Sequence, residues 1–108
     1  MRVLIDACLP VQFKARLGLG GAVTARELGW QHKKNSELLA AAQGQFDVLL
    51  TMVRGMPDQQ KLRRFGIAVV ILRARSNRLA DLLPLVPEVR RVLPRVRGGQ
   101  AVEIWPPS

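Results

Sequence analysis

Short apolar runs alternate with stretches of helical periodicity along the whole chain. The runs are rich in Val, Ile and Leu and are short enough to be strands, and the run at residues 67–72 has the clearest strand pattern. Most of these runs are apolar throughout, as expected for strands covered on both faces. We predict strands over residues 2–6, 22–25, 46–51, 67–72 and 100–105, the last as an edge strand.

Helical patterns lie between these runs. We predict helices over residues 10–17, 36–43, 57–65 and 78–93. Pro10 stands where a first helical turn tolerates proline, and Asn35 and Asn77 precede helical patterns as N-caps do. Prolines at 84, 87 and 94 predict that the last helix is split into two pieces. Residues 26–34 show no regular pattern.

Strands that alternate with helices indicate an α/β fold with a mostly parallel sheet. We therefore predict one three-layer α/β/α domain over residues 1–108, with a central sheet of about five strands and a short tail at 106–108. A chain of 108 residues has no room for two full cores.

Positive charge dominates the composition. The chain has 17 Lys and Arg against 8 Asp and Glu, a net charge of +9. Such an excess favours a polyanionic partner, because Arg pairs bidentately with phosphate; a general use of Arg as the surface cation is the alternative.

No apolar run is long enough to span a membrane, and Asp6 interrupts the first run, unlike a signal peptide. One cysteine excludes an intrachain disulfide, so we expect a cytoplasmic protein.

Asp6 is the clearest candidate for chemistry. In open α/β sheets, ligands bind beyond the carboxyl ends of the strands, and Asp6 ends the first predicted strand. A carboxylate there costs desolvation energy unless a cation or metal pairs with it; the alternative is that Asp6 caps the helix near Pro10.

Cys8 is interpreted as a small hydrophobic residue and His32 as a loop residue. Trp30 and Trp105 could stack on bases, but with 5% aromatic residues a role as core or edge cover is favoured.

Several segments together resemble the short PIN-like nucleases of prokaryotic toxin–antitoxin loci. The matching segments cover nearly the whole chain: L-I-D-A-C-L-P at 4–10, T-x-x-E-x-G-W at 24–30, K-N-x-E-L-L at 34–39, F-D-V-L-L-T at 46–51, P-x-Q-Q at 57–60 and I-A-V-V-I-L-R-A-R-S-N-R at 67–78. Each motif alone is weak, but their order and spacing are specific. The resemblance implies a PIN-like fold and, for active members, cleavage of RNA that depends on Mg²⁺ or Mn²⁺.

The resemblance also implies roles for individual residues. Asp6 matches the first-strand acid and Glu37 the acid of the second helix, so both are candidate catalytic residues and metal ligands. Asp58 is a third candidate ligand, although its spacing departs from the family pattern and an acid near a helix start is the alternative. The candidate RNA-binding cations are Arg54, Lys61, Arg63, Arg64, Lys33 and Lys34. Two acids of the family pattern are absent, because Ala7 and Val53 stand in their places. Losing two of roughly four acids weakens the field that holds a divalent ion.

Two functions follow from this pattern. The first is a metal-dependent ribonuclease, as the toxin of a toxin–antitoxin pair, with weakened or lost activity. The second is a non-catalytic module that binds nucleic acid or an antitoxin on a degenerate nuclease scaffold. A helical stripe of Leu79, Leu82, Leu83, Val86 and Val89 would serve a small antitoxin partner, although such a stripe is more often core. A homodimer stays open, and a membrane partner is not expected.

Overall fold

All five predicted strands are present in the computed structural model, which describes residues 1–54 and 59–107, without the side chains of 59–61. Each observed strand lies within its predicted range. The strands are β1 (Val3–Ile5), β2 (Ala22–Thr24), β3 (Val48–Thr51), β4 (Ala68–Leu72) and β5 (Ala101–Ile104).

The helices also follow the prediction, with corrections at their ends. They are α1 (Val11–Leu17), α2 (Asn35–Ala42), α3 (Gln59–Phe65), α4 (Leu79–Leu82) and α5 (Val86–Val92). The 3₁₀ turns η1 (Leu83–Leu85) and η2 (Leu93–Arg95) replace α-helix next to the prolines, so the expected break occurs.

Both asparagine caps were predicted at the wrong residue. Asn35 is the first residue of α2, and Lys34 holds the N-cap position. At α4 the N-cap is Arg78, whose backbone N–H donates to Ser76 Oγ at 3.1 Å. Ser76 in turn donates to Asp81 Oδ2 at 2.5 Å, so the serine, not Asn77, connects the N-cap residue to the first turn of α4.

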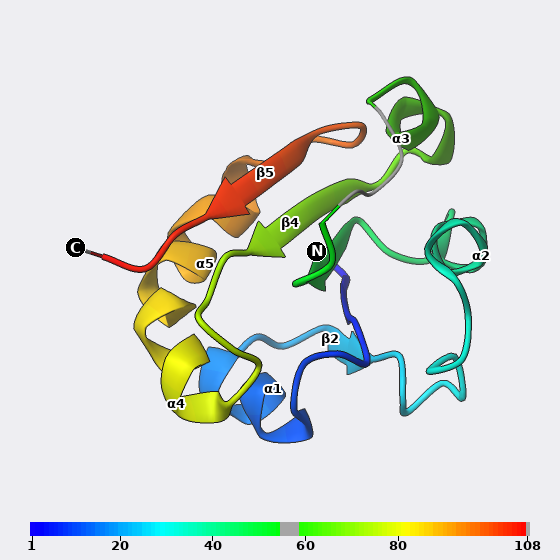
Figure 1. Cartoon of the computed structure of the whole chain (residues 1–108). Coiled ribbons are helices and arrows are strands. Elements are labelled where there is room, and N and C mark those ends of the chain that lie inside the picture. The colour runs from blue at the N-terminus through cyan, green and yellow to red at the C-terminus, as the bar shows by residue number, and fades with distance from the viewer. Residues whose placement is uncertain (55–58, 108) are drawn as a thin grey trace.

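The sheet is parallel throughout, with strand order β2-β1-β3-β4-β5. Alternate residues of each strand point to opposite faces, and both faces are covered. On one face Ile5, Leu50 and Val70 pack against α1, α4 and α5; on the other, Leu4 and Leu49 pack against α2 and α3. Figure 1 shows these two helical layers on either side of the sheet. The three-layer α/β/α prediction is confirmed.

The connection from β4 to β5 has the opposite hand to the other three. The β1–β2 connection runs towards the β2 side of the sheet, with α1 on one face. The β2–β3 and β3–β4 connections run towards the β5 side, with α2 and α3 on the other face. From β4 to β5 the direction stays the same, but α4 and α5 lie on the face of α1. Parallel crossovers are right-handed in nearly all proteins, so this last connection is the exception.

Within the described part of the chain, every helix falls short of the length and apolar character that crossing a bilayer would require.

Candidate functional site

Asp6 lies at the point where the strand order reverses. From β1 the chain turns towards β2, and from β3 it turns the opposite way towards β4, so the loops after these two neighbouring strands part from each other. Open α/β sheets bind ligands at such a switch point, beyond the carboxyl ends of the strands, and this end of the sheet is here called the carboxyl edge. The backbone N–H of Asp6 donates to Leu50 O at 2.9 Å, which fixes the start of the β1 loop against β3.

Two neutral donors hold the Asp6 carboxylate. Thr51 Oγ1 donates to Oδ2 at 2.6 Å, and the backbone N–H of Ala7 donates to Oδ1 at 2.7 Å. Thr51 is fully buried and its hydroxyl oxygen also accepts from Val53 N at 3.0 Å. Among the described residues no cation lies within salt-bridge distance of Asp6. The carboxylate is therefore fixed in position and half-buried, and its charge is not paired within this part of the chain.

Cys8 belongs to the wall of this site. Its Sγ lies 3.7 Å from Thr51 Oγ1, and the side chain packs against the core layer of α1. Burial raises the pKa of the thiol, so it stays protonated at neutral pH. Asn77 Nδ2 donates to Cys8 O at 3.2 Å, which ties the loop after β4 to the loop after β1.

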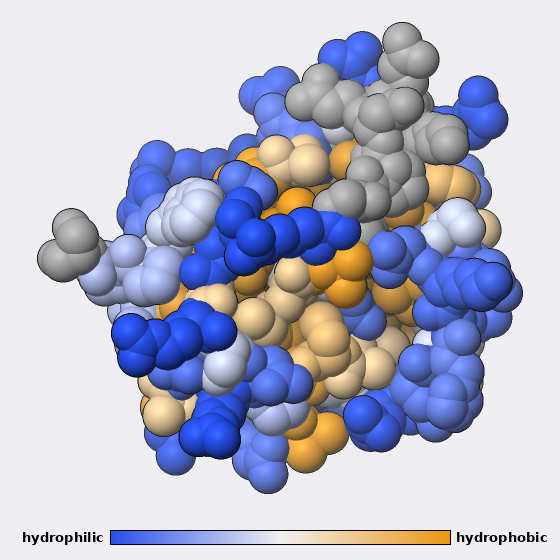
Figure 2. Space-filling model, in the orientation of Figure 1, coloured by the Kyte–Doolittle hydropathy of each residue, from blue (hydrophilic) through white to orange (hydrophobic). Residues whose placement is uncertain are grey.

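The surroundings of Asp6 are apolar. Half-buried Ala7 follows Asp6 directly, half-buried Met52 and Val53 follow the end of β3, and Ala74 follows β4 at the same edge. On the face of the whole molecule turned to the viewer in Figure 2, apolar surface lies among hydrophilic side chains. The two positions where the resemblance implies further acids, Ala7 and Val53, thus carry apolar side chains.

Glu37 lies in the first turn of α2, and its side chain is exposed. Its Oε1 accepts a hydrogen bond from the backbone N–H of Lys34 at 3.3 Å, a contact that caps the helix start. Parallel strands make every connecting helix begin at the carboxyl edge, so Glu37 and Asp6 share that edge.

The described residues nevertheless contain no group of three or more His, Cys, Asp or Glu side chains that could hold a metal ion. Asp58 lies outside the described residues. A Mg²⁺ or Mn²⁺ ion at Asp6 would depend mainly on oxygens of a bound substrate, because one carboxylate with two hydrogen bonds already made is a sparse donor set. The donors described here therefore fit the implied metal centre poorly.

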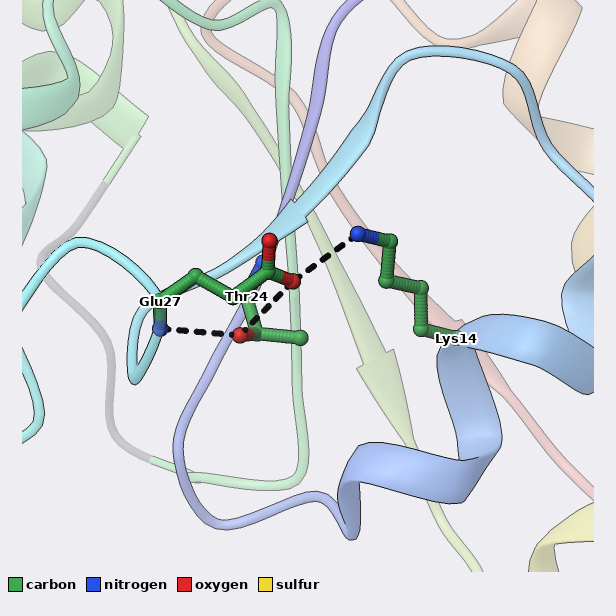
Figure 3. Close-up of polar contacts among 3 residues, drawn as sticks. All are labelled: Lys14, Thr24 and Glu27. Atoms are coloured by element: carbon green, nitrogen blue, oxygen red, sulfur yellow. Dashed lines mark hydrogen bonds and ion pairs between the residues drawn. The ribbon is translucent and has the colours of Figure 1, made fainter.

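The T-x-x-E-x-G-W segment forms a closed turn after β2. Glu27 Oε1 accepts from Thr24 Oγ1 at 3.1 Å and from Lys14 Nζ at 2.9 Å, and Glu27 N donates to Thr24 Oγ1 at 3.1 Å (Figure 3). The Lys14 hydrogen bond is the main reason that the pKa of Glu27 is lowered. Gly29 has a φ of 73°, and Trp30 then packs edge-on against Phe46. This motif shapes the loop that leads to Lys33 and Lys34.

The predicted RNA-binding cations divide between the two edges of the sheet. Lys33 and Lys34 lie exposed in the loop after β2, and Arg54 lies exposed after β3, all at the carboxyl edge. Arg63 and Arg64 occupy the last turn of α3, at the opposite, amino edge. A Cβ placed on Gly99, just before β5, would lie 2.6 Å from Arg63 Cγ, which confirms that location. The side chain of Lys61 lies outside the described residues.

A second group at the carboxyl edge, Arg73 with Trp105, was not assigned to the site from the sequence. The guanidinium of Arg73 lies 4.2 Å from the ring centroid of Trp105, and Arg73 Nη1 donates to Glu103 Oε1 at 2.6 Å. The two residues meet because the parallel register Leu72↔Ile104 sets the residues after β4 and β5 side by side. Trp105 was expected to cover an edge, yet 57% of its surface is exposed.

Comparison of the chain with protein-family models, with curated proteins and with solved structures found no significant match.

Proposed function

We propose that this protein is a PIN-like domain that binds single-stranded RNA at the carboxyl edge of its sheet, with metal-dependent ribonuclease activity weakened or lost. The observation that carries the proposal is the Asp6 carboxylate. It is held rigidly at the switch point with apolar Ala7 and Val53 beside it and with exposed cations on the neighbouring loops.

The position of Asp6 calls for a ligand. A half-buried carboxylate among apolar side chains loses hydration, and the two neutral hydrogen bonds from Thr51 and Ala7 recover only part of that loss. An evolved metal site that has lost two of its acids would leave such a residue behind. In an RNA complex the remaining lone pairs of Asp6 can accept hydrogen bonds from ribose 2′-hydroxyls, which distinguish RNA from DNA.

The cations supply the affinity for the phosphate backbone. Lys33, Lys34 and Arg54 lie on two loops of the carboxyl edge, and Arg75 and Arg78 are exposed in the loop after β4. Lys and Arg that neutralise phosphates release condensed counterions, so binding of this kind falls steeply as salt rises. The net charge of +9 supports the same interpretation.

The toxin role, a small antitoxin partner, a homodimer and a cytoplasmic location rest on the resemblance and on composition. The helical stripe proposed for an antitoxin is largely unavailable, because Leu82 and Val89 are fully buried in the core and the other three are half-buried. A partner of that kind would need a different surface.

The test measures binding of a short single-stranded RNA by fluorescence anisotropy over a range of salt concentrations. We expect affinity that falls steeply with salt and is the same in EDTA as in Mn²⁺. Cleavage of the same RNA is followed at high protein concentration with Mn²⁺, and any activity should vanish in Asp6→Ala. Affinity that does not change with salt contradicts the proposal, and so does rapid cleavage that survives Asp6→Ala.

A further inference from the structure

The most exposed aromatic ring of the chain stands at the carboxyl edge, directly after the core residue Ile104. Trp105 follows β5 directly and leaves 57% of its surface exposed, in a chain with two Trp and no Tyr. Large aromatic rings are mostly covered in folded proteins, and those left open often mark binding surfaces. Trp30, by comparison, is half-buried against Phe46.

Arg73 holds this ring from one side. Its guanidinium lies 4.2 Å from the Trp105 centroid, and the side chain is only 16% exposed because Glu103 and the ring cover it. A cation over an aromatic face is attracted to the ring, and the ion pair with Glu103 fixes the guanidinium in turn. The indole is therefore oriented before any ligand binds.

A pocket of about 230 Å³ lies beside the ring. Its walls are Trp105, Pro84, Pro87, Pro107 and Glu88. Arg73 does not border this pocket, so the ring meets it with a side that Arg73 leaves free. Proline side chains are rigid and donate no hydrogen bonds, which keeps the pocket open and apolar. The unusual hand of the β4–β5 connection places η1 and α5 on this side of the sheet, near the C-terminal end of the chain (Figure 1).

The pocket suits a nucleobase better than a phosphate. Its walls are mostly apolar, as a base requires, and its one charged wall residue is Glu88. The Glu88 carboxylate already accepts hydrogen bonds from Arg91, and its remaining lone pairs can accept one from an amino group such as N4 of cytosine. Arg91 pairs with Glu88 and lowers the pKa of that carboxyl, so it stays ionised at neutral pH.

We propose that the Trp105 pocket takes one unstacked base of an RNA strand bound along the carboxyl edge, an inference that rests on the function proposed above. The strand order separates the ends of β1 and β5 by three strand spacings, or about 14 Å. A strand of a few nucleotides can therefore run from Asp6 to Trp105, with exposed Arg54 and Arg75 on the loops between them. Stacking on an exposed ring needs no particular base sequence.

The experiment uses the full chain with Trp30→Phe, so that Trp105 is the only tryptophan. Two RNA probes of equal length and charge are compared, a cytidine oligonucleotide and an abasic strand. We expect the cytidine strand to quench Trp105 fluorescence and to bind about tenfold more tightly than the abasic strand. In Trp105→Ala, followed by anisotropy, that advantage should disappear while binding of the abasic strand is unchanged. Trp105→Phe should keep part of the advantage.

The outcomes separate the two proposals. If both strands bind equally in every variant, the base pocket is wrong and RNA binding at the carboxyl edge stands. If neither strand binds even at low salt, the proposed function fails and the pocket fails with it. Shielding of Trp105 that grows with protein concentration in the free protein also overturns the inference, because a second copy of the chain would then fill the pocket.

Discussion

The two edges of the sheet are both rich in arginine, but they are built differently. At the amino edge the end of α3 packs tightly on the turn before β5: a Cβ on Gly98 would lie 2.7 Å from the backbone O of Gly66. At the carboxyl edge the loops are joined by side chains, through Asp6 with Thr51 and Asn77 with Cys8, and a pocket opens beside Trp105. Only the part of the amino edge beside the end of α3 is closed by its own backbone; a pocket of about 240 Å³ opens elsewhere on that edge, beside Met1, Gly21 and Arg90. Arginine content alone therefore does not locate a binding surface.

Adding the two acids that the PIN-like resemblance implies at the carboxyl edge should have the largest effect. We expect Ala7→Glu with Val53→Asp to raise Mn²⁺-dependent cleavage of single-stranded RNA by roughly 100-fold or more, because the added carboxylates rebuild the field that binds the ion. The rate is measured on a labelled oligonucleotide. Adding Asp6→Asn to the same protein serves as the control and should remove the gain. A restored protein that binds Mn²⁺ and RNA without cleaving would contradict the PIN-like interpretation of the site.

The amino edge should instead respond in stability. We expect Gly98→Ala to lower the free energy of unfolding by about 2 kcal/mol, because the new methyl group meets a backbone oxygen that cannot move aside easily. Urea denaturation measures the change. Gly20→Ala is the matched control, since a Cβ there meets no atom within 4 Å. RNA binding by folded Gly98→Ala protein should equal that of the unaltered chain; a selective loss of affinity would place binding at the amino edge.

A smaller stability effect is expected from the hydrogen bond that holds Asp6. Thr51→Val keeps the shape of the buried side chain but leaves Asp6 Oδ2 and Val53 N without their partner, at a cost of about 1.5 kcal/mol. The same substitution made in Asp6→Ala should cost less, and the difference is the coupling between the two residues. Equal costs in both backgrounds would show that the hydrogen bond contributes nothing to stability.

The ion pair at the rim of the carboxyl edge should have the smallest effect. Lys14 lowers the pKa of Glu27 below its ordinary value of 4.5, so the stabilising contribution is complete above that value and is lost as the pH falls through the lowered folded pKa. Lys14→Met should therefore lower Tm slightly at neutral pH and not at all in strong acid. A difference in Tm that persists in acid would mean that Lys14 acts through packing.

The fold was largely predictable because its signals are local. Apolar runs and prolines identify the strands and the broken last helix, whereas the caps were misplaced because the observed N-caps, Lys34 and Arg78, are residue types that do not signal a helix start. The site was only partly predictable. Asp6 ends a strand and could be placed at the carboxyl edge, whereas the position of Arg63 at the amino edge follows from where α3 ends in the sheet topology. The pairing of Arg73 with Trp105 depends on the register of β4 and β5, which no local pattern specifies.

The most direct test of RNA binding at the carboxyl edge compares two charge reversals of equal size. Lys33→Glu with Lys34→Glu alters the carboxyl edge, and Arg63→Glu with Arg64→Glu alters the amino edge. Affinity for single-stranded RNA is measured across a range of salt concentrations. The first pair should weaken binding about tenfold and reduce the slope of log K against log salt by about two, while the second pair leaves the slope unchanged. Equal losses from both pairs, or a larger loss from the second, would contradict the account.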